Sequence, residues 1–578
     1  MNIHAIRRAL WLALLLPLFA PGVGRIGRQA AVAASGPAPH AAPPQAQRLT
    51  SDSESELQGF LYAAELSNLR WPDFENYAGE VREFYGSYGG ALAWVRKSKP
   101  TPQARAIIEL LKNAESKGLN PEDYDGGRWD ARLASFARRK SPTESELVRF
   151  DLAITVSAMR YVSDLHIGRV SPRLLHFEFE NDHGELDMSE FVRQRLVDAP
   201  DVKAAIETVE PPYPSYRRTL AALQTYLELA RRDTGELLPV PRKPVKPGDS
   251  YSGVARLARL LKLVEDLPHN YQTDASATTY HGAVVDAVKH FQMRHGLEPN
   301  GQLDERTLKE LNTPLSRRVL QLKLTLERWR WLPNGFKPPM IVVNIPEFRL
   351  RVVDEEFRWA LSMNVVVGRA YRDQTPVFTT EMKSVVFRPY WNVPLAIQRT
   401  ELLPEIEKNS AYLAKNAYEI VDAKGAIVST DGITDEMKEA LRTGTLMIRQ
   451  RPGPENSLGL LKFDMPNSFD VYMHDTPATQ LFARSRRDFS HGCIRVEDPV
   501  ALADWALRDQ PEWTEEKIRA AMNGDATFHV NLRKPVPVLI VYGTAFVMED
   551  AEVRFFDDIY GNDAALEEIL SRGYPYWN

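Results

Sequence analysis

The sequence has almost no cysteine: Cys493 is the only one among 578 residues. No intrachain disulfide can therefore form. A lone cysteine is most often a small buried hydrophobic side chain. Exported proteins, however, tend to use cysteines in disulfide pairs, so a single thiol in an oxidising compartment indicates a chemical task. The neighbours of Cys493 decide between these two interpretations.

The sequence also lacks an excess of positive charge and a second long apolar run. A formal net charge of −5 gives no overall basic field, which argues against nucleic acid as a partner. The apolar run 9–20 follows Arg7 and Arg8 and precedes small residues, with Ala-Val-Ala at 31–33 as the candidate cleavage site. This order predicts a secretory signal peptide over residues 1–34, because the run is short for a membrane span; an uncleaved N-terminal anchor is the alternative.

A chain of this length predicts three or more domains. Residues 35–50 are rich in Pro and Ala, which is typical of a disordered linker. Residues 51–240 have apolar positions at helical spacing, with Gly118 and Gly168 where helix C-caps belong, and predict a helical scaffold domain. A second linker, rich in Pro and Lys, follows at 240–249.

Residues 250–315 predict a compact three-helix domain. Its helices are expected over 254–267, 281–296 and 304–312, with Asp304 as the N-cap of the last. Its landmark residues are Phe291, Gln292, Gly296, Leu297, Gly301, Thr307, Leu311 and Asn312. Together they resemble the peptidoglycan-binding module found beside many wall enzymes. Phe291 and Leu311 are expected in its core and the two glycines in turns, so the ligand-contacting residues stay unassigned.

Residues 316–545 predict a mostly β catalytic domain. Its β-branched and aromatic runs are 340–353, 357–368, 382–394 and 469–476. Residues 395–450 turn partly helical and are expected to be a helical cap inserted over the site. Asp498 and Pro499 are expected as N-cap and first residue of a later helix. Residues 546–578 are expected to pack on the catalytic or the scaffold domain, which completes an α+β multidomain architecture.

Residues 471–496 contain the motif that carries chemistry. His474 precedes Cys493 by 19 residues, and Cys493 lies within a Ser-His-Gly-Cys-Ile-Arg run. A thiol attacks as the thiolate and needs a neighbouring base or positive charge to form it. Gly492 permits a tight turn whose amides can face an oxyanion. The basic residues nearby are Arg484, Arg486, Arg487 and Arg495. We expect the first two to be solvated surface charges, whereas Arg495 follows the thiol on the same side of a strand.

This segment resembles the signature of L,D-transpeptidases, in which a histidine precedes Ser/Thr-His-Gly-Cys by about this interval. The upstream RPYWNVP (388–394), the insertion and the closing segment 545–563 resemble the large multidomain subfamily of Gram-negative periplasms. The resemblance spans nearly the whole mature chain. It implies a location in the periplasm, either free or held at the inner membrane.

The resemblance also implies residue roles. Cys493 corresponds to the nucleophile, His474 to the general base, the backbone carbonyl of Asp475 to the group that orients the imidazole, and the amides of His491, Gly492 and Cys493 to the oxyanion hole. The residues expected to bind substrate are Tyr472, Ser490, Arg495, Trp391 and Asn392. His491 departs from the small residue common in the subfamily and is a second candidate base. We favour His474, because a base held on a separate element can be oriented by it.

The implied reaction is acyl transfer between peptidoglycan stem peptides. The thiol would take the acyl group of a tetrapeptide donor, release D-alanine and pass the acyl group to the side-chain amine of a diamino acid, giving a 3→3 cross-link. No metal or organic cofactor is expected, and carbapenems should acylate the thiol. Water or a lipoprotein lysine as acceptor, and a wall-binding protein without activity, are the alternatives. Other wall-synthesis enzymes are candidate partners, and the sequence does not predict the oligomeric state.

Overall fold

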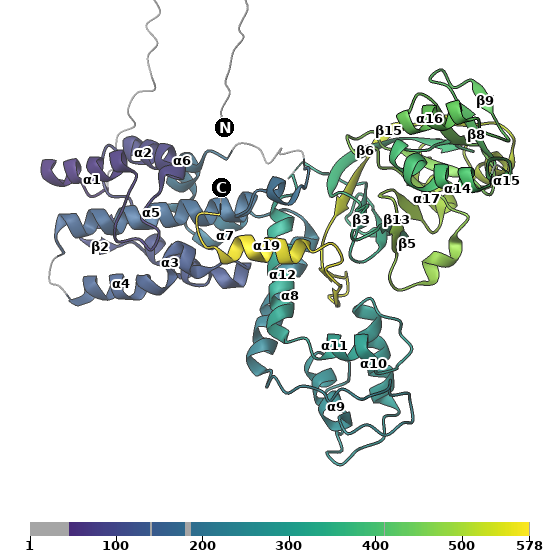
Figure 1. Ribbon diagram of the computed structural model, residues 1–578. Helices are drawn as coiled ribbons and strands as arrows, with labels where there is room; N and C mark the ends of the chain where they lie inside the picture. The colour runs from purple at the N-terminus through teal and green to yellow at the C-terminus, as the bar shows by residue number, and fades with distance from the viewer. Residues whose placement is uncertain (1–45, 139–141, 180–185, 334, 410, 577–578) are drawn as a thin grey trace, which may run out of the picture.

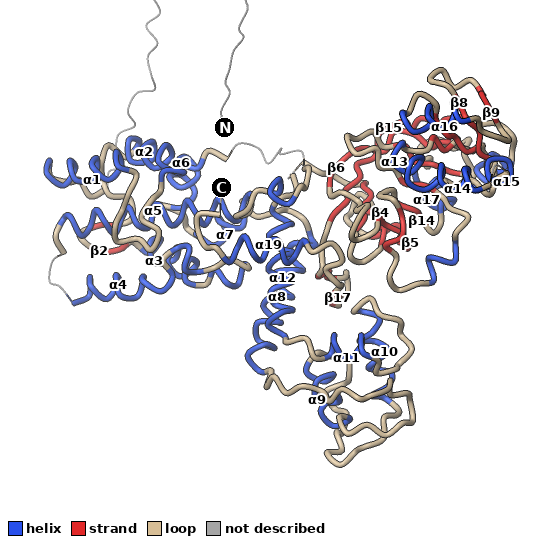
Figure 2. The backbone as a smooth tube through the Cα atoms, in the orientation of Figure 1, coloured by secondary structure: helices blue, strands red, loops and turns tan. Residues whose placement is uncertain are grey.

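The chain folds into three lobes around a central group of helices (Figure 1). The residues described by the computed structural model are 46–138, 142–179, 186–333, 335–409 and 411–576. The expected signal peptide and most of the expected linker at 35–50 lie outside these residues. Within the described part of the chain, no helix has the length and apolar character needed to cross a membrane. Figure 2 shows that most of the strands gather in one lobe, while the other lobes are built from helices and loops.

The first lobe is helical, as the periodicity predicted. Its helices are α1 (Ser51–Ala63), α2 (Ala78–Ser87), α3 (Pro102–Lys112), α4 (Trp129–Arg138), α5 (Glu144–Ile167), α6 (Met188–Phe191) and α7 (Val202–Glu207), with a two-stranded ribbon of β1 (Val95–Arg96) and β2 (Lys99–Pro100). A capping box between Thr143 and Glu146 starts the buried α5. Gly118 has the left-handed C-cap conformation, as expected. Gly168 is the C-cap of α5, also as expected, with φ 81° and ψ 171°, and it lies where a Cβ would meet Trp331.

The centre of the molecule is the pair α8 (Pro214–Arg232) and α12 (Leu315–Arg330), joined by α19 (Asn562–Ser571). The expected domain boundary at 316 assigned α12 to the catalytic domain, but this helix packs along α8. Its buried Glu327 accepts hydrogen bonds from the Arg169 side chain and the Val170 amide after α5. A buried carboxylate needs such partners, so this contact fixes the scaffold lobe against the centre.

The small lobe contains α9 (Val254–Leu263), α10 (Ala283–Arg294) and α11 (Glu305–Leu311). The structure confirms Asp304 as N-cap, because its carboxylate accepts the Thr307 amide at 2.7 Å. Phe291 and Leu311 lie in the core of this lobe, as predicted. Its α10 also contacts the hairpin of β16 (Ala545–Val547) and β17 (Val553–Phe555), where the His290 ring lies 2.9 Å from Glu552. The C-terminal segment therefore touches the small lobe as well as the centre.

The third lobe is built on a sheet that closes on itself, because β5 pairs with β4 as well as with β13 and β14. Along the sheet the strands are β13 (Asp488–Ser490), β5 (Trp359–Gly368), β14 (Ile494–Val496), β12 (Met473–His474), β11 (Leu461–Asp464), β6 (Phe378–Phe387), β15 (Phe528–Val541), β3 (Met340–Asn344) and β4 (Arg349–Val353). Two helices, α17 (Pro499–Ala506) and α18 (Glu515–Asn523), pack on its core. Asp498 caps α17 and Pro499 starts it, as predicted.

The insertion differs from the helical cap that the sequence predicted. It contains α13 (Leu395–Ile397), α14 (Leu403–Lys408), α15 (Tyr412–Lys415) and α16 (Asp435–Thr443), but also its own sheet in the order β7 (Trp391–Asn392), β10 (Met447–Gln450), β8 (Tyr418–Val421) and β9 (Ile427–Ser429). Leu403, Ile420 and Ile448 are among the buried residues of a separate hydrophobic core. The insertion is therefore an α/β subdomain.

Candidate active site

The thiol lies at the turn between β13 and β14. Strand β14 runs parallel to β12, with Met473 opposite Ile494 and His474 opposite Arg495. The Ile494 amide donates to the Tyr472 carbonyl at 3.0 Å, which places Cys493 beside Tyr472. The predicted strand at 469–476 is shortened to two residues, because the loop before it is folded on itself by the Asn467 side chain.

His474 is buried, with 4% of its surface exposed. Its Nδ1 lies 2.5 Å from the Asp475 carbonyl oxygen, the contact that the family resemblance implied. Because a carbonyl can only accept, Nδ1 carries the proton and Nε2 keeps a lone pair. Burial, reinforced by the charge of Arg495, lowers the pKa of His474 to about 3. The imidazole is therefore neutral at physiological pH and can act as a base.

Cys493 is half-buried. Burial raises the pKa of its thiol, and hydrogen bonding from Tyr472 together with the charges of Lys462 and Arg495 opposes that shift. The Lys462 ammonium lies 4.3 Å from the centre of the Tyr472 ring, and this ring lies 5.8 Å from that of His474. The resting pair is thus a neutral thiol and a neutral imidazole, and deprotonation must accompany attack.

The turn before the thiol is held by side chains. Ser490 is 2% exposed, and its hydroxyl donates to the Cys493 carbonyl and accepts the Gly492 amide at 3.2 Å. Ser490 therefore holds the turn, whereas we expected it to bind substrate. Its hydroxyl also accepts from the Gly492 amide, which is one of the three amides expected in the oxyanion hole. In the described part of the chain, neither the His491 nor the Cys493 amide donates to another residue. Gly492 has φ 110°, a backbone conformation that favours glycine.

The turn is also supported by two side chains that were not predicted, Thr375 and Tyr560, which act through the backbone of Gly368 and Gly492. The Thr375 hydroxyl donates to the Gly492 carbonyl at 2.7 Å and accepts the Gly368 amide, while the Tyr560 hydroxyl donates to the Gly368 carbonyl at 2.6 Å. A threonine before a proline and one tyrosine among 21 carry no signal in the sequence. Only the folded sheet brings them to the turn.

The second candidate base, His491, faces the insertion. Its Nε2 lies 2.7 Å from a Glu401 carboxylate oxygen and 3.0 Å from an Arg369 guanidinium nitrogen. The Arg369 guanidinium also lies 3.6 Å from Glu401. The Nε2 nitrogen donates its proton to that carboxylate, so this nitrogen is held at the insertion and not at the thiol. This contact joins the inserted subdomain to the residue two positions before Cys493.

The other predicted residues divide into two groups. Trp391 donates a hydrogen bond to the Tyr472 hydroxyl, whereas Asn392 is exposed at the edge of the insertion's sheet. Arg495 is half-buried beside the thiol, and its Nε has no partner in the part of the chain that is described. The arginines that precede the turn do not act on the thiol. Arg486 pairs with Asp488 at 2.7 Å, Arg484 lies over Phe489, and the buried Arg487 donates to main-chain carbonyls.

This geometry is that of a Cys–His site on a closed β-sheet, in a protein with two further helical modules. Residues 338–538 match the family described as "L,D-transpeptidase catalytic domain", residues 255–311 match a "Putative peptidoglycan binding domain", and residues 79–223 match a "Scaffold domain". The chain therefore contains an L,D-transpeptidase catalytic domain and a peptidoglycan-binding domain, as the sequence resemblance indicated.

A protein of Haemophilus influenzae named "Putative L,D-transpeptidase" is 32% identical to the chain over 246 residues. The match covers 43% of this chain and 48% of the relative. The chain thus spans about half the length of the curated relative that it matches.

The neutral resting pair predicts how the alkylation rate of the free thiol depends on pH. Alkylation of Cys493 by iodoacetamide should have its midpoint above the ordinary thiol pKa of about 8.5, because burial disfavours the thiolate. Arg495→Gln should move the midpoint higher still, since it removes a charge that favours the thiolate. Arg484→Gln is the matched control and should leave the midpoint unchanged. Rate measurements from pH 6 to 10 would contradict the neutral pair if the midpoint lay at or below the ordinary value.

Proposed function

We propose that the protein is an L,D-transpeptidase that forms 3→3 cross-links between peptidoglycan stem peptides through a thioester on Cys493. The observation that supports it most is the placement of a half-buried thiol beside the strand that carries a neutral, carbonyl-oriented His474. The two matched domains supply the chemistry and the wall-binding module that this reaction needs.

The proposed first half-reaction acylates the thiol. Cys493 Sγ attacks the carbonyl carbon of the third stem residue while its proton passes to His474 Nε2. The free amides of His491 and Cys493 are the donors proposed for the oxyanion. Collapse breaks the C–N bond to the terminal D-alanine, whose amine takes the proton from His474. The product is a thioester and free D-alanine.

The second half-reaction transfers the acyl group. The side-chain amine of a neighbouring diamino acid loses a proton to His474 as it attacks the thioester carbonyl, and Cys493 leaves and is reprotonated. We place the protein in the periplasm, on the strength of the signal-like sequence at its start and the location of the acceptor. Partners among other wall-synthesis enzymes would be met there.

Hydrolysis of the same thioester, as an L,D-carboxypeptidase or amidase, is the second candidate. The half-exposed thiol favours it, because water can reach a site that no substrate fills. Intact-mass measurement after incubation with a carbapenem tests the shared first step and should show one covalent adduct on Cys493. Analysis of the products from a purified tetrapeptide donor then separates cross-linked peptide from tripeptide. Absence of an adduct would refute both functions.

The inserted subdomain is proposed as a lid that closes over the donor and limits water at the thioester. Its Glu401 contacts His491, so the subdomain already touches the turn that carries the thiol. Replacing residues 396–449 by a short Gly/Ser linker should leave carbapenem acylation partly intact and lower the ratio of transfer to hydrolysis several-fold. Because the subdomain has its own core, its removal exposes little of the closed sheet's core.

Two substitutions refine that test without removing the subdomain. Glu401→Gln should lower the same ratio, and Glu439→Gln, on the exposed side of α16, is the matched control. Both ratios are read from the products of one donor and one acceptor peptide. A linker variant that folds and keeps the full-length ratio would show that the insertion is not a lid.

A further inference from the structure

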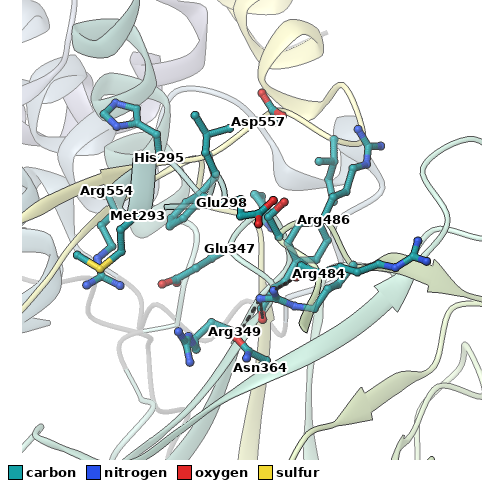
Figure 3. A pocket seen from close by; sticks show the side chains of 18 of the residues that line it. Met293, His295, Glu298, Glu347, Arg349, Asn364, Arg484, Arg486, Arg554 and Asp557 are labelled. Atoms are coloured by element: carbon teal, nitrogen blue, oxygen red, sulfur yellow. Dashed lines mark hydrogen bonds between the residues drawn. The ribbon is translucent and has the colours of Figure 1, made fainter. Parts of the chain in front are cut away.

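A second concave site lies between the small lobe and the closed sheet. Its volume is about 300 Å³. Most of the walls come from four segments: residues 293–299 at the end of α10, residues 346–349 at the start of β4, residues 482–487 before β13, and residues 554–559 at the end of β17. Arg306 and Asn364 complete the lining. Figure 3 shows charged side chains from these segments around the cavity. The peptidoglycan-binding module and the catalytic domain therefore share one pocket.

Arginines outnumber carboxylates two to one on its walls. The charged residues that line it are Arg306, Arg349, Arg484, Arg486, Arg487 and Arg554 against Glu298, Glu347 and Asp557. Several of these charges already have partners. The ion pairs are Arg306–Asp557, Arg486–Asp488, Arg554–Glu552 and Arg351–Glu347. Arg349, Arg484, Arg487 and Glu298 are left without an ion pair among the described residues, and of these Arg487 donates to main-chain carbonyls.

Arg349 is the strongest indication that the pocket takes an anion. Its side chain is half-buried, and in the described part of the chain it makes neither an ion pair nor a hydrogen bond. Burial lowers its pKa; Glu347 opposes that shift, while the charges of Arg351 and Arg554 add to it. A guanidinium has five donors in a planar fork that matches a carboxylate. An anion in this cavity would pair with a guanidinium that makes no ion pair within the described part of the chain.

Glu298 restricts what kind of anion fits. Its exposed carboxylate lines the same cavity, opposite in charge to Arg349 and Arg484. A compact anion such as phosphate would leave Glu298 facing like charge. A peptide with carboxylates and an amine would satisfy all three groups, because ammonium pairs with carboxylate and carboxylate with guanidinium. Such a zwitterionic end is present on a stem peptide that terminates in a diamino acid.

We propose that this cavity binds a carboxylate-bearing stem peptide, with Arg349 and Arg484 on a carboxylate and Glu298 on an amine. The proposal deepens the proposed function and rests on it for the identity of the peptide. The wall 482–487 continues directly into β13 and the turn of Cys493. Asn364 in the pocket and Gly368 beside Ser490 are four residues apart on β5, about 13 Å along the strand. A peptide held here positions its glycan strand next to the thiol site.

Calorimetric titration of the Cys493→Ser protein tests the site, because that variant does not consume the peptide. The probe is a synthetic stem tripeptide that ends in a diamino acid, compared with the same peptide with amidated carboxyls and with inorganic phosphate. Adding Arg349→Gln or Arg484→Gln should weaken tripeptide binding about tenfold or more, the usual loss for a charge-assisted hydrogen bond. The amidated peptide and phosphate should bind at least tenfold more weakly than the tripeptide to the unsubstituted site.

Arg358→Gln, in an exposed ion pair on the same domain, is the charge-matched control and should bind as the parent does. Thermal unfolding checks that each variant is folded, and Arg484 is exposed enough for its replacement to be tolerated. Equal binding by Arg349→Gln, Arg484→Gln and Arg358→Gln would overturn the proposal, as would phosphate binding as tightly as the tripeptide. Carbapenem acylation of the unsubstituted protein, with Cys493 intact, tests the proposed reaction separately, so failure of this site and failure of the proposed reaction are distinguishable.

Discussion

Cys493→Ser is expected to abolish both cross-linking and carbapenem acylation, with a loss on the order of 10⁴ or more in rate. A serine hydroxyl beside a single imidazole is ionised far less than a thiol. The low pKa of His474 makes activity depend more strongly on the thiol, because a weakly basic imidazole can take a proton only from a group that gives it up readily. The measurement is product formation from tetrapeptide donor and acceptor, with intact mass for the acyl-enzyme.

The same substitution should leave the fold intact. The turn is held by Ser490, Thr375 and the ladder between β12 and β14, none of which uses the thiol. The sulfur makes a weak contact, 3.9 Å from the Asp470 carbonyl oxygen, and accepts hydrogen bonding from Tyr472, which a serine hydroxyl can also accept. Thermal unfolding of the variant should therefore match the parent. A folded Cys493→Ser protein that still cross-links would remove the thiol from the mechanism.

The features that sequence predicted best are local ones. Asp304 and Asp498 cap helices because the side chain that accepts and the amide that donates lie three residues apart, so the motif is complete within one turn. The interval between His474 and Cys493 is likewise visible in one segment, and the Asp475 carbonyl is the neighbouring residue of the base. Such features need no knowledge of the rest of the chain.

The features that sequence missed depend on distant parts of the chain. His491 and Glu401 are 90 residues apart, and nothing in either neighbourhood indicates their contact. The helical interpretation of the insertion failed where β8 and β10 pair, because short strands of four residues are stabilised by the partner and not by their own pattern. Gly168 is the C-cap of α5 that its position predicted, but the close approach of the Trp331 side chain, which leaves no room for a Cβ there, is not visible in the local sequence.

His474→Ala is expected to lower the acylation rate by on the order of 10²–10⁴, the usual range for removal of a general base. The structure gives the reason: Nδ1 is fixed on the Asp475 carbonyl, and burial keeps the ring neutral so that Nε2 can accept. Without it the thiol must ionise unaided, and acylation by a carbapenem should then rise steeply with pH toward the raised pKa of Cys493. Because the site is buried, His474→Gln, which preserves volume better, should show the same loss.

His491→Ala is the matched comparison, and we expect it to cost less than about tenfold, because its ring is held by Glu401 rather than by the thiol. Its loss should appear mainly as a lower ratio of transfer to hydrolysis, since the contact it removes belongs to the inserted subdomain. The two variants are measured side by side as second-order acylation rates at one pH, with thermal unfolding as the check on folding. If His491→Ala proved the slower of the two, His491 would be the base. The contact between His474 and the Asp475 carbonyl would then only hold the local structure of the site.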